Sequence, residues 1–163
     1  MIRQLIPAVN ETDYHILLPA YLELINSPEA LKYLSYTGIP FTQEMVSSWL
    51  KTHLDAGIDY YADFSEDRRI QGIVVTKSNS LSGFELLGLA VRAINRERGV
   101  GKGLVRYVMN RAVESGFASV DVTVFADNIP MLRLLLGQGF IPVSMTYHVR
   151  FDGADAVNFK LYV

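Results

Sequence analysis

The spacing of apolar residues changes near position 58 and separates a helical first part of the chain from a strand-rich remainder. After a short expected strand over 1–6, apolar residues recur every three or four positions across 11–36 and 43–54, which is typical of amphipathic helices. The sequence Asn26-Ser27-Pro28 interrupts the first range and is typical of a helix end followed by a new N-cap. The second helix is expected to bury one side, formed by Met45, Val46, Trp49, Leu50 and Leu54.

From position 59 onward, short apolar runs separated by polar turns predict strands. We expect these strands over residues 59–64, 70–77, 84–92, 119–125, 140–150 and 156–163. Nearly every position of 84–92 is apolar, which predicts a strand buried on both faces. Two more helices are expected, one beginning near Leu104 and one over 129–136. The strand–helix–strand unit over 84–125 predicts parallel pairing, and the hairpins on either side predict antiparallel pairing. The sequence therefore predicts a single α/β domain over residues 1–163, with helices on a mixed sheet.

Composition narrows the classes of function that the chain can perform. Of the 163 residues, 50% are hydrophobic and 20% are charged, which is typical of a globular protein. The net charge of −2 argues against nucleic acid as a partner. The absence of cysteine excludes disulfides, thiolate zinc sites and a thiol nucleophile, and the three histidines show no metal-ligand spacing. No signal peptide and no apolar run long enough for a transmembrane helix are recognised, so we expect a cytoplasmic protein without membrane association.

A basic, glycine-rich turn over residues 96–103 is the most informative segment. It follows the apolar strand that ends near Arg92, and it leads into the helix that contains Leu104. A helix N-terminus exposes unpaired N–H groups and partial positive charge, and glycines let a ligand approach the backbone closely. Arg96, Arg98 and Lys102 add positive charge. These features predict a binding site for a phosphate group.

Three types of phosphate-binding loop can be compared with this turn. A P-loop would need glycine at position 96 and Ser or Thr at position 103, where the chain has Arg96 and Gly103. A dinucleotide-binding fingerprint would need one more residue between the last two of its glycines. The third type fits: Arg96-x-x-Gly99-x-Gly101 resembles the acetyl-CoA signature of the GNAT superfamily of N-acetyltransferases.

Further segments extend the resemblance to this family over the whole chain. Leu89-Ala90-Val91 matches the strand that precedes the signature, and Asn128 and Gly139-Phe140 match the following motif in the correct order. The resemblance implies a GNAT fold with a central mixed sheet of six to seven strands and about four helices. It also implies transfer of an acetyl group from acetyl-CoA (coenzyme A) to a primary amine of a small molecule or a peptide.

The resemblance also implies which residues bind the cofactor. The pantetheine arm would contact the strand backbone at Leu89, Ala90 and Val91, and the Val91 N–H would polarise the acetyl carbonyl. Asn128 would reach the cofactor from the next strand, although it would equally cap the following helix. The pyrophosphate would be held by the turn, through Arg96, Arg98, Gly99, Val100, Gly101, Lys102 and Gly103.

Catalysis and specificity are less well defined by the sequence. Glu85 occupies the strand position of a catalytic base in part of the family, and an apolar surrounding would raise its pKa; a solvated edge residue is the alternative. The family's proton-donating tyrosine is replaced by Leu135, so Tyr60, Tyr61, Tyr107 and Tyr147 become candidate substitutes.

Three further questions stay open at this stage. Because Leu135 cannot donate a proton, a second hypothesis is an acyl-CoA-binding sensor or scaffold domain without turnover. Tyr33, Tyr36, Phe41 and Trp49 either form an aromatic acceptor wall or pack in the core. A homodimer is an option because the strand over 156–163 could form a sheet edge.

Overall fold

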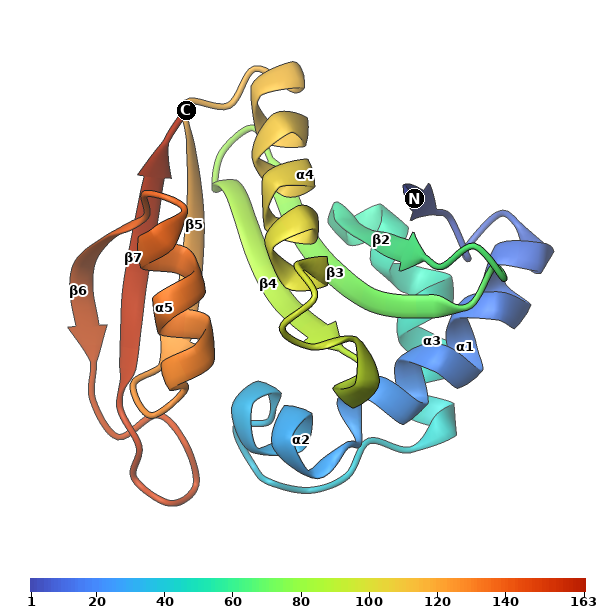
Figure 1. The fold of residues 1–163 in the computed structure, drawn as a ribbon, viewed down its shortest axis with the longest axis horizontal. Coiled ribbons are helices and arrows are strands. Elements are labelled where there is room, and N and C mark those ends of the chain that lie inside the picture. The colour runs from blue at the N-terminus through green and yellow to red at the C-terminus, as the bar shows by residue number, and fades with distance from the viewer.

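The computed structural model describes residues 1–163 and shows one continuous mixed sheet with helices on both faces (Figure 1). The seven strands are β1 (Ile2–Leu5), β2 (Ile58–Phe64), β3 (Ile70–Asn79), β4 (Gly83–Val91), β5 (Ser119–Phe125), β6 (Ile141–Thr146) and β7 (Ala156–Tyr162). The α-helices are α1 (Glu11–Ile25), α2 (Pro28–Leu34), α3 (Gln43–Thr52), α4 (Val100–Glu114) and α5 (Ile129–Gly137). This architecture confirms the predicted α/β fold with a mixed sheet.

The strand order is β1-β2-β3-β4-β5-β7-β6, and all neighbouring pairs are antiparallel except β4 and β5. The parallel pair confirms the prediction from the strand–helix–strand unit. The terminal strand β7 lies between β5 and β6, so the prediction that it forms a sheet edge was wrong. On this side of the sheet the edge strand is β6, and all six of its residues are exposed.

Two hydrophobic clusters hold the helices on opposite faces of the sheet. α4 packs on one face through Leu104, Val105 and Val108 and shares a cluster with residues of β4, β5 and β7. α1 and α3 pack on the other face through residues such as Leu17 and Val46. α5 lies on the same face as α4, over β5 and β7 (Figure 1).

Local sequence signals explain where the first helices begin and end. Asn10, Ser27 and Thr42 each accept a hydrogen bond from a backbone N–H in the first turn of α1, α2 and α3, respectively. The break at residues 26–28 was therefore predicted correctly. Gly57, in a left-handed conformation with φ of 71°, caps the 3₁₀ turn that follows α3.

Several details of the sequence prediction were wrong. Met45 and Leu54 of the helical stripe are exposed rather than buried, because only Val46 and Leu50 of α3 reach the sheet. The sixth strand ends at Thr146 instead of continuing to residue 150. The chain there leaves the ladder through His148, which has a φ of 53°. The prediction that 84–92 is buried on both faces also fails, because β5 diverges from this strand.

Candidate functional site

The divergence of β4 from β5 creates the main cleft of the molecule. The two strands pair only from Phe84 to Leu86 and from Val120 to Val122. At the point of separation Leu87 has no partner on β3, because the register passes from Leu86 directly to Gly88. Such a bulge bends a strand and increases its twist. The resulting cleft has a volume of about 610 Å³ and lies between β4, β5, α2 and the beginnings of α4 and α5.

The second half of β4 presents backbone hydrogen-bonding groups to this cleft. The Arg92 N–H donates to the Gln71 carbonyl on the β3 side. Because these groups alternate in direction along a strand, Leu89 and Val91 direct theirs away from β3, where β5 has already separated. A ligand in the cleft can therefore pair with β4 as an additional strand would.

The N-terminus of α4 opens into the same cleft. Gly99 adopts a left-handed conformation with φ of 83° as the N-cap, which favours glycine, and no side chain caps the helix. The first intrahelical bond runs from the Gly103 N–H to the Gly99 carbonyl at 2.9 Å. The amides of Val100, Gly101 and Lys102 consequently have no intrahelical acceptor and are available to an anion.

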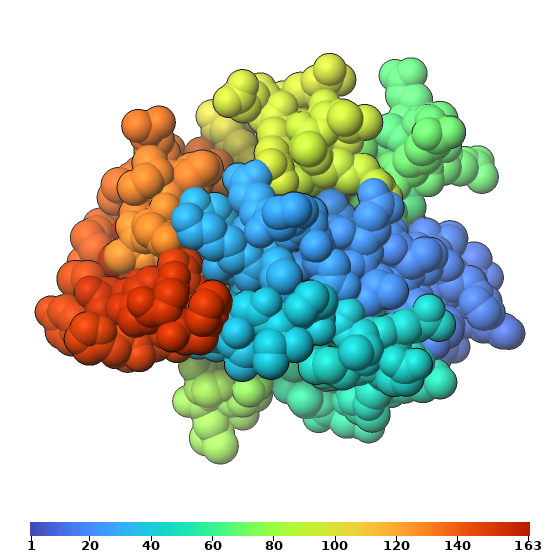
Figure 2. Space-filling model, turned by 90° about the horizontal axis from the view of Figure 1, so that it is seen from below, coloured from blue at the N-terminus to red at the C-terminus, as the bar shows by residue number.

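Helix α2 closes one end of the cleft. Its residues Ala30, Tyr33 and Leu34 line the cleft. Seen from below, α2 lies between the segment before α4 and the loop that joins β6 to β7 (Figure 2). On the β4 side it is held by an ion pair between Glu29 and Arg96. The cleft thus has walls from three parts of the chain that are distant in sequence, residues 29–34, 86–102 and 122–134.

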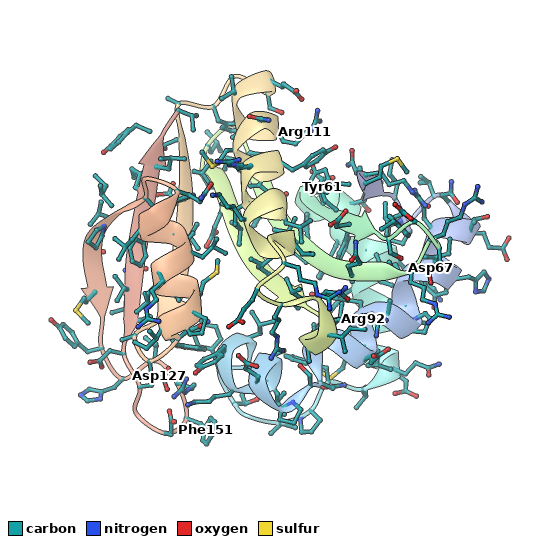
Figure 3. The ribbon with its side chains drawn as sticks, viewed as in Figure 1. Tyr61, Asp67, Arg92, Arg111, Asp127 and Phe151 are labelled. Carbon is teal, nitrogen blue, oxygen red and sulfur yellow. The ribbon has the colours of Figure 1, made fainter.

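On the β5 side α2 is held by a buried arginine. The guanidinium of Arg150, whose side chain is 2% exposed, binds both carboxylate oxygens of Asp127 at 3.0 and 2.6 Å. It also binds both oxygens of Asp152 and the backbone carbonyl of Lys32 in α2. Figure 3 shows Asp127 between α5 and α2. These bonds hold the pKa of Asp127 below its usual range and lower that of Asp152 to about 2.

Eight of the twelve predicted site residues line the cleft. They are Leu89, Ala90, Val91, Arg96, Gly99, Gly101, Lys102 and Asn128. Asn128 also accepts a hydrogen bond from the Met131 N–H, so it caps α5 as well. Arg98 is exposed on the loop, Val100 at the start of α4 is buried in the core, and the Gly103 N–H is already bonded within the helix.

Glu85 lies next to the cleft but does not line it. It immediately precedes Leu86, the last residue of β4 that pairs with β5, and it faces away from α4. Its neighbours on this face are Lys77 on β3 and Asp121 on β5. Partial burial raises the pKa of Glu85, Lys77 opposes this shift, and Asp121 adds to it. A raised pKa is the property expected of a carboxylate base.

The four tyrosines considered as replacements for the missing acid all lie elsewhere. Tyr60 and Tyr61 are 2% exposed in the core, Tyr107 packs against Tyr61, and Tyr147 is exposed on the loop after β6. Leu135 is completely buried in the core of α5. The sequence analysis missed the position of α2, because no local signal places that helix across the cleft.

The aromatic residues of the first helices divide into two groups. Trp49 packs between Phe41 and His53, away from the cleft. This arrangement supports core packing for Phe41 and Trp49. Tyr33 lines the cleft, and Tyr36 contacts Phe125 beside it. No group of three or more His, Asp or Glu side chains could hold a metal ion, and no helix has the length and apolar character needed to cross a bilayer.

Comparison with known proteins identifies the family. The model of the acetyltransferase (GNAT) family matches residues 23–140. The chain belongs to the GNAT acetyltransferase family. This family catalyses acyl transfer from acetyl-CoA, and the cleft of this chain offers the required groups: strand-edge amides along β4 and free amides with basic side chains at the start of α4. No curated protein matches the sequence.

Solved structures support the same fold. The ribosomal-protein-alanine N-acetyltransferase from Brucella melitensis has a TM-score of 0.79 at 19% identity and covers 100% of this chain and 99% of its own. The ribosomal-protein-S18-alanine N-acetyltransferase from Escherichia coli has a TM-score of 0.74 at 18% identity, covering 100% and 93%. The yncA protein from Salmonella typhimurium, solved with its cofactor acetyl-CoA, has a TM-score of 0.75 at 14% identity, covering 99% and 92%.

Proposed function

We propose that this GNAT protein is an N-acetyltransferase that moves the acetyl group of acetyl-CoA onto a primary amine by direct attack, with both substrates bound. The observation that carries the proposal is the cleft between β4 and β5, where backbone groups and the α4 N-terminus face one space. The acceptor would be a small molecule or a peptide. The relatives that act on ribosomal-protein alanine support an amine acceptor for this chain.

Each side of the cleft has a distinct task in this proposal. Leu89 and Val91 bind the pantetheine arm through their backbone, and the Val91 N–H stabilises negative charge on the acetyl oxygen. The amides of Val100, Gly101 and Lys102 bind the pyrophosphate. Acetyl-CoA supplies the acetyl group in activated form, as a thioester. Asn128 contacts the cofactor from the β5 side.

Glu85 is the proposed general base, which accepts a proton from the attacking amine directly or through water. A base must be deprotonated to act, so activity is expected to fall as the pH drops through the raised pKa of Glu85. Thiol release, followed across a panel of primary amines and over pH, tests both the activity and this assignment. Glu85→Gln should lose most activity and this pH dependence.

Asp121→Asn provides a matched control for that experiment. Asp121 on β5 lies beside Glu85 in the β4–β5 pair and forms an ion pair with Lys160 at 2.8 Å, so its replacement changes a neighbouring carboxylate but not the proposed base. The control should stay active, with its inflection moved to lower pH, because Asp121 raises the pKa of Glu85. Full activity with unchanged pH dependence in Glu85→Gln would show that another group is the base.

A domain that binds acyl-CoA without turnover is the second candidate, favoured by the completely buried Leu135 in place of a proton donor. Acetyl-CoA binding without thiol release from any amine in the panel would favour this candidate over the enzyme.

A further inference from the structure

Of the polar side chains that line the cleft, only one is suited to donate a proton to a ligand bound there. The polar lining consists of Glu29, Tyr33, Arg96, Glu97, Lys102, Thr123 and Asn128. Arginine and asparagine do not release a proton near neutral pH. Glu97 and Lys102 are exposed at the beginning of α4, and Glu29 is paired with Arg96.

Thr123 is also unsuitable as a donor. Its hydroxyl donates to Asn158 Oδ1 at 2.9 Å, on the face that carries the polar side chains of β6. An aliphatic hydroxyl is in any case a much weaker acid than a phenol. Tyr33 is the only one of the nine tyrosines that lines the cleft.

The phenol of Tyr33 is held in place but is not committed to a strong hydrogen bond. Its Oη–H donates to the Asp127 carbonyl at 3.4 Å, which is longer than the usual O–H···O distance of about 2.5–3.0 Å and indicates a weak bond. The Lys32 ammonium lies over the Tyr33 ring, 5.1 Å from the ring centroid. Asp127 is itself fixed by Arg150. The phenol can therefore exchange its weak bond for a bond to a ligand atom without a change in the backbone.

We propose that Tyr33 is a catalytic residue, which donates its phenol proton to the sulfur of CoA as the acetyl group is transferred. This inference rests on the proposed N-acetyltransferase function. The acetyl carbon gains a C–N bond and loses its C–S bond, whose electron pair stays on sulfur. The amine nitrogen gives up its proton to Glu85, sulfur takes the Tyr33 proton and leaves as a thiol, and water returns a proton to the phenolate.

The assignment places the acid on α2, the helix that also closes one end of the cleft. It explains how Leu135 can be part of the core without loss of turnover. It also predicts that the same phenol stabilises the negative form of the CoA thiol when the free product is bound, because a hydrogen bond to a charged group favours that charge.

The test uses Tyr33→Phe, with Tyr36→Phe as its matched control. Tyr36 lies three residues further along the chain, beyond the end of α2; it is 54% exposed and does not line the cleft. Three quantities are measured: acetyl-CoA affinity by calorimetry, kcat and KM by thiol release, and the pKa of the bound CoA thiol by its thiolate absorbance. The last measurement does not depend on turnover.

For Tyr33→Phe we expect an affinity within about twofold of the wild type. We also expect kcat to fall by about 100-fold with little change in KM and the bound thiol pKa to rise by about one unit. Tyr36→Phe should match the wild type in all three. An unchanged thiol pKa and kcat in Tyr33→Phe would overturn the assignment, as would equal losses in both variants.

Failure of the underlying function gives a different result. If the wild type binds CoA but releases no thiol with any amine, the enzymatic proposal fails. The thiol titration then still decides whether Tyr33 contacts the sulfur: a pKa difference between the wild type and Tyr33→Phe supports the contact, and equal values refute it. If the wild type does not bind CoA, both proposals are wrong.

Discussion

Replacement of Arg150 by methionine should destabilise the protein and loosen the closed end of the cleft. Methionine fills part of the space of the arginine side chain but removes the guanidinium donors to Asp127, Asp152 and the Lys32 carbonyl. Asp127 then keeps only the Lys32 ammonium, at 3.5 Å, as a charged partner. Removing one partner of a buried ion pair costs about 3–5 kcal/mol. Asp127 is 38% exposed and regains water after the change, so we expect a loss of about 2–3 kcal/mol. For a domain of this size the loss lowers Tm by roughly 4–12 °C.

The dependence of this loss on pH follows from the lowered carboxylate pKa values. A carboxylate with a depressed pKa in the folded state contributes stability above its unfolded pKa and loses it as the pH falls through the folded value. The pKa of Asp152 is lowered to about 2, and that of Asp127 is lowered as well. The stability difference between wild type and Arg150→Met should therefore be full at pH 7 and shrink as the pH falls from about 4 toward 2.

Urea denaturation of both proteins at several pH values measures this difference directly. Arg150→Lys is the matched control, because it keeps the charge but loses the forked geometry that binds two carboxylates. It should recover only part of the lost stability. If Arg150→Met unfolds at the wild-type urea concentration at pH 7, or if the difference is the same at pH 3, the buried guanidinium does not stabilise this end of the cleft as described.

Three glycine substitutions give further predictions. Gly72→Ala should cost about 1–3 kcal/mol in urea denaturation, because a Cβ there lies 3.0 Å from Leu104 Cδ1 of α4 and 3.1 Å from the Ala90 carbonyl oxygen; unchanged stability would refute this close packing. Gly99→Ala should cost about 1–2 kcal/mol because of its φ of 83° and should weaken acetyl-CoA binding in calorimetry. Gly103→Ala should keep or raise Tm, because its added Cβ meets only Ile2 Cδ1 at 3.9 Å and alanine favours a helix. A marked loss of stability or of acetyl-CoA binding would contradict the placement of Gly103 inside α4.

The elements that local rules govern could be predicted from the sequence. Helix caps, the parallel crossover and the turn from Gly99 to Gly103 depend on residues close together along the chain. The closed end of the cleft could not be predicted in this way. The bond from Arg150 to the Lys32 carbonyl joins residues 118 positions apart, and neither segment carries a pattern that specifies the other.

The prediction that β4 is buried on both faces was wrong for a related reason. A run of apolar residues indicates contact with something apolar, but it does not distinguish a neighbouring strand from an open cleft. In this chain Leu87 is 41% exposed, and Leu89 and Val91 line a space that β5 has left. The apolar positions of this strand therefore belong partly to the core and partly to the site. Tyr33 was noticed only as an aromatic residue, because its proximity to Asp127 depends on the tertiary structure.

Calorimetric titration of the wild type and Gly101→Asp with acetyl-CoA tests the central claim most directly. A Cβ at position 101 would lie 3.5 Å from Leu134 Cδ2 and 3.7 Å from Leu89 Cδ2, which the fold tolerates, and an aspartate in the first turn suits the helix dipole. The carboxylate would nevertheless repel the pyrophosphate. We predict one-to-one binding by the wild type and none by a folded Gly101→Asp with near wild-type Tm. No binding by the wild type, or equal binding by both proteins, would contradict this account of the cleft.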